Sequence, residues 1–160
     1  MNYEHAAGGG GSLVKIAVNL PPSDWYSHVV ETMWATPIGS GRYRVENVPF
    51  YAYGISFADV VQANSIGDQL IIQDVAVRGG HSTYRAFLNA GVTIEHADFT
   101  NVWSRLQAIG ASFEQASDRL LAVDIPPDTN IYDAYALLER GESAGVWDFE
   151  EAHCGHQLSE

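Results

Sequence analysis

Residues 79–110 read GGHSTYRAFLNAGVTIEHADFTNVWSRLQAIG, and within them a strand pattern is followed by a helix pattern. The double glycine marks a break in the chain, and STYRAFLNA after it reads as a strand. Apolar residues then recur at the spacing of one helix face, at Phe99, Val102, Trp103, Leu106 and Ile109. Asp98 or Thr100 is expected to cap this helix, and Gly110 to follow its last turn.

The alternation of strands and helices continues after Gly110. Residues 111–117 and 119–126 are two predicted strands, and residues 145–152, GVWDFEEA, are a third. Between them, TNIYDAYALLERG predicts a helix that ends before Gly141, with one face formed by Ile131, Ala134, Tyr135 and Leu138. The resulting order, β-α-β-β-α-β, predicts a ferredoxin-like half.

The part of the chain before Gly79 lacks sustained helical periodicity. Its predicted strands are residues 13–20, 28–39, 42–50, 58–63 and 69–78, separated by proline and glycine turns. A small open barrel or curled sheet follows from this pattern. The predicted fold class is therefore α+β, with an N-terminal β-rich half packed on the ferredoxin-like half.

Glycine-rich sequence precedes these elements. Residues 6–12 read AAGGGGS, which is typical of a flexible linker or an engineered spacer, because such residues bury too little to offset their ordering entropy. We therefore predict a leader over residues 1–12, the β-rich half over 13–78, the ferredoxin-like half over 79–152 and a tail over 153–160.

The charge balance restricts the classes of partner. Eight Lys and Arg residues face 20 Asp and Glu residues, which gives a formal charge of −12. Phosphate backbones are bound by neutralising them with basic side chains, so nucleic acid is not an expected partner, whereas a basic protein is. No apolar run is long enough to span a membrane. A single cysteine and no visible signal peptide favour a cytoplasmic location.

Several stretches together resemble an uncharacterised bacterial family, a domain of unknown function of about this length. They are GRYR at 41–44, NVPF at 47–50, GIS at 54–56 before DVV at 59–61, and GHSTYR at 80–85. They correspond to the patterns G-x-Y-R, N-x-P-F, G-x-S before D-x-V, and G-H-S-T-x-R. The resemblance covers about residues 13–152 and implies no activity.

The first candidate site is the stretch GRYRVENVPFYAYG at 41–54. Tyrosine and arginine are enriched where proteins bind one another, which makes Tyr43, Arg44, Asn47 and Tyr53 candidate binding residues. The competing interpretation is structural, because Asn47 before Pro49 favours a turn and arginine stems cover apolar surface.

The second candidate site is the start of the strand at residue 82. Alternate residues of a strand share a face, so His81, Thr83 and Arg85 are expected to point the same way. With Arg44 they form a candidate catalytic or anion-binding site between the halves. The competing interpretation is a crossover at the glycines whose backbone is bonded by hydroxyl side chains.

Metal and cofactor sites are not predicted. The tail sequence His153-Cys154-Gly155-His156 offers three potential zinc ligands, fewer than the four that a structural site needs. The sequence contains no phosphate-binding loop or dinucleotide fingerprint. We therefore predict that the protein uses no cofactor.

The third candidate site is acidic and aromatic. Trp147, Asp148, Phe149, Glu150 and Glu151 are adjacent, and aromatic rings among carboxylates suit a basic protein or peptide. The competing interpretation is a solvated face over a core tryptophan. The leading hypothesis is a non-enzymatic cytoplasmic binding protein, of the immunity or antitoxin kind, for a basic partner. A small enzyme or an anion-binding domain is the alternative.

Overall fold

The computed structural model describes residues 12–159, and the predicted leader lies outside them except for Ser12. Five strands form a closed barrel: β1 (Val14–Asn19), β2 (Val30–Gly39), β3 (Arg42–Val45), β4 (Val60–Ile66) and β5 (Gln69–Val77). Consecutive strands pair antiparallel, and β1 pairs parallel with β5 through Ala17 and Ile71. The barrel is thus closed and not open, because its first and last strands meet.

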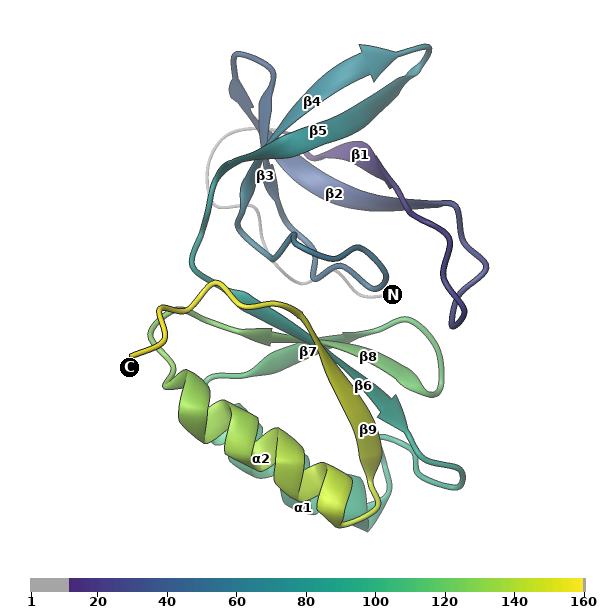
Figure 1. Cartoon of the computed structure of the whole chain (residues 1–160), viewed down its shortest axis with the longest axis vertical. Coiled ribbons are helices and arrows are strands. Elements are labelled where there is room, and N and C mark those ends of the chain that lie inside the picture. The colour runs from purple at the N-terminus through teal and green to yellow at the C-terminus, as the bar shows by residue number, and fades with distance from the viewer. Residues whose placement is uncertain (1–11, 160) are drawn as a thin grey trace.

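A second sheet with two helices lies below the barrel in Figure 1. Its elements are β6 (Ser82–Leu88), α1 (Ala97–Ala108), β7 (Ser112–Gln115), β8 (Leu120–Ile125), α2 (Ile131–Ser143) and β9 (Trp147–His153). The strand order is β7-β8-β6-β9, and every neighbouring pair is antiparallel. Both helices cover the face of this sheet that points away from the barrel (Figure 1). The mixture of two sheets and two helices confirms the α+β class.

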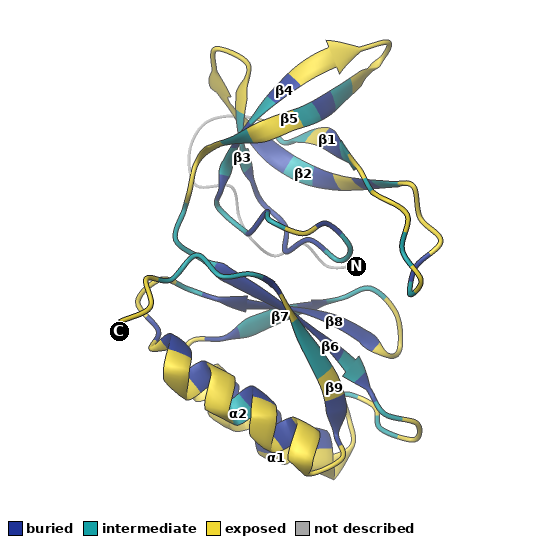
Figure 2. Ribbon diagram, viewed as in Figure 1, coloured by how far each residue is buried: buried dark blue, intermediate teal, exposed yellow. Residues whose placement is uncertain are grey.

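Each layer has its own apolar core. In the barrel, alternate inward residues of the strands pack together, among them Ile16, Met33, Val45 and Val61. In the lower layer, α1 and α2 bury their apolar stripes on β6 and β8, as their burial pattern shows (Figure 2). Neither helix is long and apolar enough to cross a lipid bilayer.

The helix ends differ from prediction at two positions. His96 caps α1, because its Nδ1 accepts the backbone N–H of Asp98 at 3.1 Å, so neither Asp98 nor Thr100 is the cap. Gly141 does not follow α2 but lies inside it, where an added Cβ would collide with the Trp147 indole. Gly110 does follow α1, with a φ of 110° that favours glycine.

A long connection between β3 and β4 lies between the barrel and the lower sheet (Figure 1). We call residues 46–59 the interlayer segment. Its residues 46–49 are all buried, as are Ala52, Ile55 and Asp59, although it contains no helix or strand. Buried backbone needs hydrogen-bond partners, so this segment must be bonded by side chains from both layers.

Candidate functional site

The interlayer segment is held at residues 50–52 between a carboxylate and a guanidinium. Glu31 accepts the backbone N–H groups of Phe50, Tyr51 and Ala52 at 2.6, 3.0 and 2.9 Å. From the other side, Arg85 donates from Nε to Phe50 O at 2.6 Å and from Nη2 to Ala52 O at 2.5 Å. Arg85 is fully buried, and this burial lowers its pKa. Its two bonds position the segment, and its burial leaves the guanidinium no exposed surface for a ligand.

Asn47 connects the layers at the other end of the segment. Its Oδ1 accepts the N–H of Trp34 at 2.7 Å, and its Nδ2 donates to Glu114 Oε1 at 3.0 Å. The second oxygen of Glu114 accepts the N–H of Val48. Asn47 is 5% exposed, so its prediction as a binding residue is wrong, and the structural interpretation holds for it.

Thr83 is bonded within the protein as well. Its hydroxyl lies 2.7 Å from the hydroxyl of Ser56, and both residues are fully buried. Near this pair, Asp59 accepts the N–H of Gly79 at 2.8 Å and a bond from Arg78 at 3.0 Å. Thr83 therefore joins β6 to the interlayer segment, and its buried, bonded hydroxyl supports the structural interpretation of this strand start.

The predicted cluster of His81, Arg85 and Arg44 has three separate sets of partners. His81 lies 2.8 Å from the Asp124 carboxylate, and Arg44 bonds Glu46 at 2.8 Å. Arg85 bonds the carbonyls of the interlayer segment, as described above. None of the three lines the cavity that does lie between the barrel and the sheet. Thr83 and Arg85 do share a face of β6 and are interlayer contacts, whereas His81, just before β6, bonds Asp124 of β8 in its own layer.

The C-terminal tail is anchored by a serine–histidine contact. His156 donates from Nε2 to Pro126 O at 2.9 Å, so its Nδ1 accepts the Ser82 hydroxyl at 2.6 Å. The same hydroxyl accepts the N–H of Gly155 at 2.9 Å, and Ser82 is fully buried. This pair therefore positions the tail. Within residues 12–159, no three His, Cys, Asp or Glu residues gather closely enough to hold a metal ion.

Trp147 does not belong to any surface. It is fully buried, and its indole N–H donates to Leu138 O at 2.9 Å. Its prediction as a binding residue is therefore wrong. Phe149, two residues later on the same face of β9, is half-buried and meets Tyr135 edge-on at 5.4 Å. Tyr135 was predicted inside the helix core, yet it is 42% exposed, because it lies at the margin of the apolar stripe of α2.

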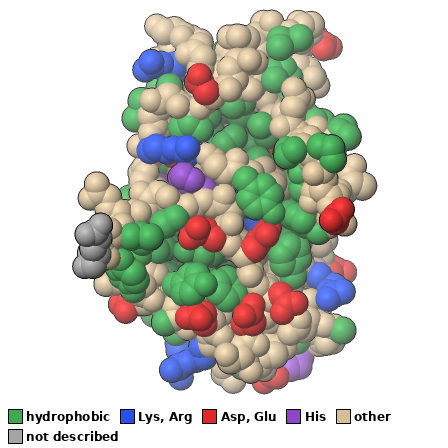
Figure 3. Space-filling view, in the orientation of Figure 1, with side chains coloured by type: hydrophobic (Ala, Val, Ile, Leu, Met, Phe, Trp, Pro, Cys, Tyr) green, Lys and Arg blue, Asp and Glu red, His purple; other side chains and the backbone are tan. Residues whose placement is uncertain are grey.

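Exposed aromatic and acidic side chains gather where α2, β9 and the tail meet. We define the acidic–aromatic face by Tyr132, Tyr135, Phe149, Leu158, Glu139, Glu142 and Glu151. Figure 3 shows hydrophobic side chains bordered by acidic ones over this lower half of the molecule. The sequence predicted residues 147–151 for this surface but not the residues of α2 or Leu158. Helical spacing identifies the buried apolar stripe of α2, but it does not show which residues at the edge of that stripe are exposed.

A cavity of about 380 Å³ opens in this face. Its walls come from β6, α2, β9 and the tail: Tyr84, Ile131, Tyr132, Tyr135, Ala136, Glu139, Glu151, Cys154 and Leu158. Tyr84 donates to Glu151 Oε1 at 3.1 Å. Burial, followed by the charge of Glu151, raises the pKa of Tyr84, so this hydroxyl stays protonated and fixes the carboxylate at the cavity wall.

The carboxylates of this face take part in no close ion pair of the described residues. Among residues 12–159, the ion pairs within 4 Å involve Glu46, Asp59, Asp98 and Asp124, and none involves a glutamate of the acidic–aromatic face. Glu150 accepts a bond from Tyr53 at 2.8 Å, and Tyr53 accepts the indole N–H of Trp25 at 3.1 Å. Tyr43, by contrast, packs on the barrel core, and Asp148 is exposed beside the face.

Comparison with known proteins establishes the fold and the family. A solved structure titled "Novel crystal structure of a hypothetical protein from Neisseria gonorrhoeae" aligns with a TM-score of 0.74, over 90% of this chain and 98% of that chain. The two sequences are 16% identical, so the likeness concerns the fold alone. No curated protein matches the chain. The family model described as Domain of unknown function (DUF4265) matches residues 31–149, and the chain therefore belongs to that family.

Proposed function

We propose that the protein is a cytoplasmic binding protein whose acidic–aromatic face takes a lysine- or arginine-rich segment of a basic protein. The observation that carries this proposal is the cavity of about 380 Å³ with apolar walls and two glutamates, Glu139 and Glu151. A lysine or arginine side chain matches such a cavity, because its stem is apolar and its head is positively charged.

The cavity suits a single inserted basic side chain. Its stem would contact Ile131, Ala136 and Leu158, and its head would meet the carboxylates of Glu139 and Glu151. Charge-assisted hydrogen bonds of this kind are about twice as strong as neutral ones. The exposed rings of Tyr132 and Tyr135 add cation–π attraction for neighbouring basic residues.

The charge of the whole chain supports the same partner. A formal charge of −12 attracts a basic protein over distances longer than those of direct contacts. An inhibitor of a basic enzyme, of the immunity or antitoxin kind, would use both the long-range attraction and the local cavity. The alternative, a small enzyme or anion-binding domain near His81, Arg85 and Arg44, has less support, because Arg85 is buried and the three residues bond separate partners.

We also infer that residues 79–152 form a ferredoxin-like half. The support is the order of elements from β6 to β9 together with the antiparallel strand order β7-β8-β6-β9. In this arrangement each β-α-β unit leaves a gap between its strands that a strand of the other unit fills. The acidic–aromatic face then lies at the sheet edge formed by β9 and beside the second helix.

The test is binding of a fluorescein-labelled peptide of alternating lysine and leucine, followed by fluorescence anisotropy. The double variant Glu139→Gln/Glu151→Gln should bind about tenfold more weakly, because it removes two charge-assisted contacts. The matched control, Asp68→Asn/Asp118→Asn, removes the same formal charge from two turns away from the face. Its affinity should stay within about twofold, since only long-range attraction is reduced.

Two outcomes would contradict the proposal. Equal weakening in both double variants would show that the peptide responds to net charge and not to the cavity. Absence of saturable binding to the unaltered protein would exclude the face as a site for basic segments.

A further inference from the structure

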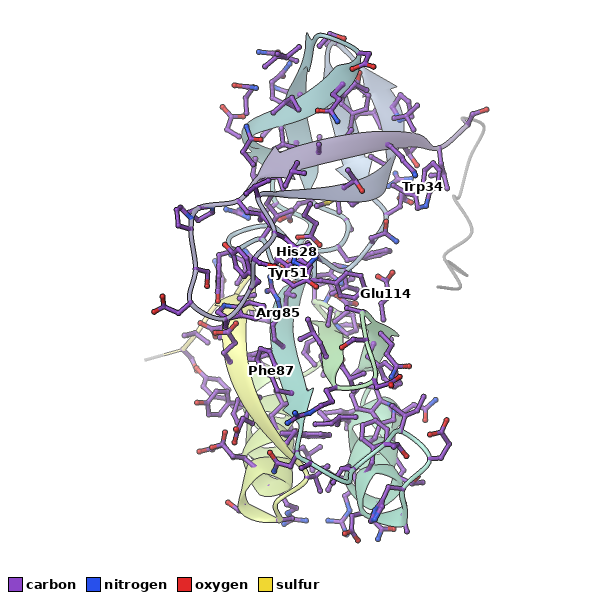
Figure 4. The ribbon with its side chains drawn as sticks, turned by 90° about the vertical axis from the view of Figure 1, so that its right-hand side faces the viewer. His28, Trp34, Tyr51, Arg85, Phe87 and Glu114 are labelled. Atoms are coloured by element: carbon purple, nitrogen blue, oxygen red, sulfur yellow. The ribbon has the colours of Figure 1, made fainter. Side chains whose placement is uncertain are left out.

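A second cavity lies between the barrel and the lower sheet, and it shares no lining residue with the cavity of the acidic–aromatic face. Its volume is about 440 Å³. The connection between β1 and β2 supplies Trp25, Tyr26, Ser27 and His28, the interlayer segment supplies Tyr51, and the sheet and its β7–β8 turn supply Phe87, Ser117, Arg119 and Leu120. In Figure 4, His28, Tyr51 and Phe87 follow one another from the barrel toward the sheet. We call this space the interlayer cavity.

Aromatic rings form most of its wall. Trp25 meets Phe87 edge-on at 5.2 Å and Tyr51 at 5.6 Å, and His28 stacks on Tyr51 at 4.3 Å. Such a group of rings offers both faces and edges to a flat molecule. Four aromatic side chains and a histidine line this cavity, and none of them belongs to the core cluster of the barrel.

The rings are held in place by polar contacts. The indole N–H of Trp25 donates to Tyr53 at 3.1 Å, and the hydroxyl of Tyr26 donates to Pro21 O at 2.6 Å. Tyr51 is fixed through its backbone, which Glu31 binds at 3.0 Å. The cavity wall is therefore preorganised, which lowers the entropy that a ligand would have to overcome on binding.

The charged side chain in the wall of this cavity is basic. Arg119 lines it together with the imidazole of His28, and among residues 12–159 no aspartate or glutamate does, although the chain has 20 acidic and 8 basic residues. Arg119 donates from Nε to Leu88 O at 2.8 Å, which orients the guanidinium. Asp118, its neighbour in sequence, lines a different depression together with Glu95.

We propose that the interlayer cavity binds a small planar aromatic molecule that carries one anionic group. Its ring lies against Trp25, Tyr51 and Phe87, and its carboxylate or phosphate meets the guanidinium of Arg119. The hydroxyl of Ser117 and the imidazole of His28 are further polar groups at the cavity wall. Rings give the affinity, and the guanidinium gives the preference for an anion.

The experiment is a titration of the ¹⁵N-labelled protein, monitored at the indole N–H signals of its four tryptophans. Indole-3-acetate supplies the ring and the anion, tryptamine supplies the same ring with a cation, and acetate supplies the anion alone. Trp25→Phe assigns the Trp25 signal, and Trp34, Trp103 and Trp147 are internal controls. We expect a saturable shift at Trp25 with indole-3-acetate, a much weaker one with tryptamine and none with acetate.

A chain with a charge of −12 attracts cations in general, so unspecific binding would favour tryptamine. Preference for indole-3-acetate would therefore come from the cavity itself. Arg119→Gln should weaken indole-3-acetate binding about tenfold and leave tryptamine within about twofold. Arg105→Gln, an exposed arginine of α1, is the matched control and should change neither.

The proposal is overturned by any of three results. The first is the absence of a saturable shift at Trp25 with indole-3-acetate. The second is tryptamine binding as tightly as indole-3-acetate. The third is an equal response of the Arg119 and Arg105 variants, which would show that the guanidinium at the cavity has no part in binding.

Discussion

Gly141 shows how a single residue can mislead a reading of the sequence. A glycine near the end of a helical pattern predicts the helix end, because glycine readily adopts the conformation that terminates a helix. Here α2 continues to Ser143, and Gly141 is buried against the indole of Trp147. The requirement comes from a residue on the next strand, and no local pattern contains it.

Replacing this glycine tests the contact. Gly141→Ala should destabilise the protein by about 1–3 kcal/mol, because overpacking against Trp147 outweighs the higher helix propensity of alanine. Ser143→Ala, at an exposed position of the same helix, should change the free energy of unfolding by less than about 0.5 kcal/mol. Urea denaturation measures both. A stabilised Gly141→Ala protein would show that the helix end, and not the indole, determines this position.

Buried polar residues also limit what can be predicted about single residues from the sequence. Arg85, Asn47 and Thr83 were reasonable candidates for a site, since such side chains are usually exposed. Each of them bonds a partner that is 27 to 67 residues away in sequence, and these bonds join the lower sheet to the interlayer segment. A sequence pattern that extends over a few residues cannot distinguish a buried bond across layers from a ligand contact.

The elements themselves could be predicted well. Strands and helices were located correctly from β1 to β9, because turn residues separate them and their apolar spacing differs. Closure of the barrel was missed, since it depends on a parallel contact of β1 with β5 through Ala17 and Ile71. The sequence predicts strand and turn for the interlayer segment, but the structure holds it by bonds from side chains.

The hydrogen bonds from the interlayer segment to Glu31 lead to a prediction about stability. Glu31→Ala leaves three N–H groups at buried or half-buried residues without an acceptor, so it should cost about 3 kcal/mol or more. Glu31→Gln retains one acceptor oxygen and should cost less. Hydrogen exchange at Tyr51 and Ala52 should accelerate in both variants. Glu95→Ala, at an exposed site, is the control, and an equal effect there would contradict the role of Glu31.

For the whole molecule, the interlayer segment joins two separate apolar cores. Bonds from Asn47, Phe50, Ala52 and Ser56 connect it to the lower sheet. The backbone N–H of Gly54 adds a contact with Ala152 O at 3.1 Å. Because these groups are buried, separating the layers would expose them without their partners, which favours joint unfolding.

Thermal unfolding should therefore be a single cooperative transition. The calorimetric enthalpy should equal the van 't Hoff enthalpy, as it does for two-state domains. Fluorescence from Trp34 in the barrel and from Trp103 in the lower layer, each measured in a variant that lacks the other tryptophans, should give one midpoint. Two separated transitions would show that the layers are independent.

The interlayer segment also determines which parts of this chain can be exchanged with a relative. A chimera joined at residues 78 and 79 would combine Asn47 of one parent with Glu114 of the other, and the carbonyls of one with Arg85 of the other. Such a hybrid requires both parents to share these contacts. The hairpin of β4 and β5 lies outside all of them, so recombination and changes of length are best tolerated at its turn, at Gly67 and Asp68.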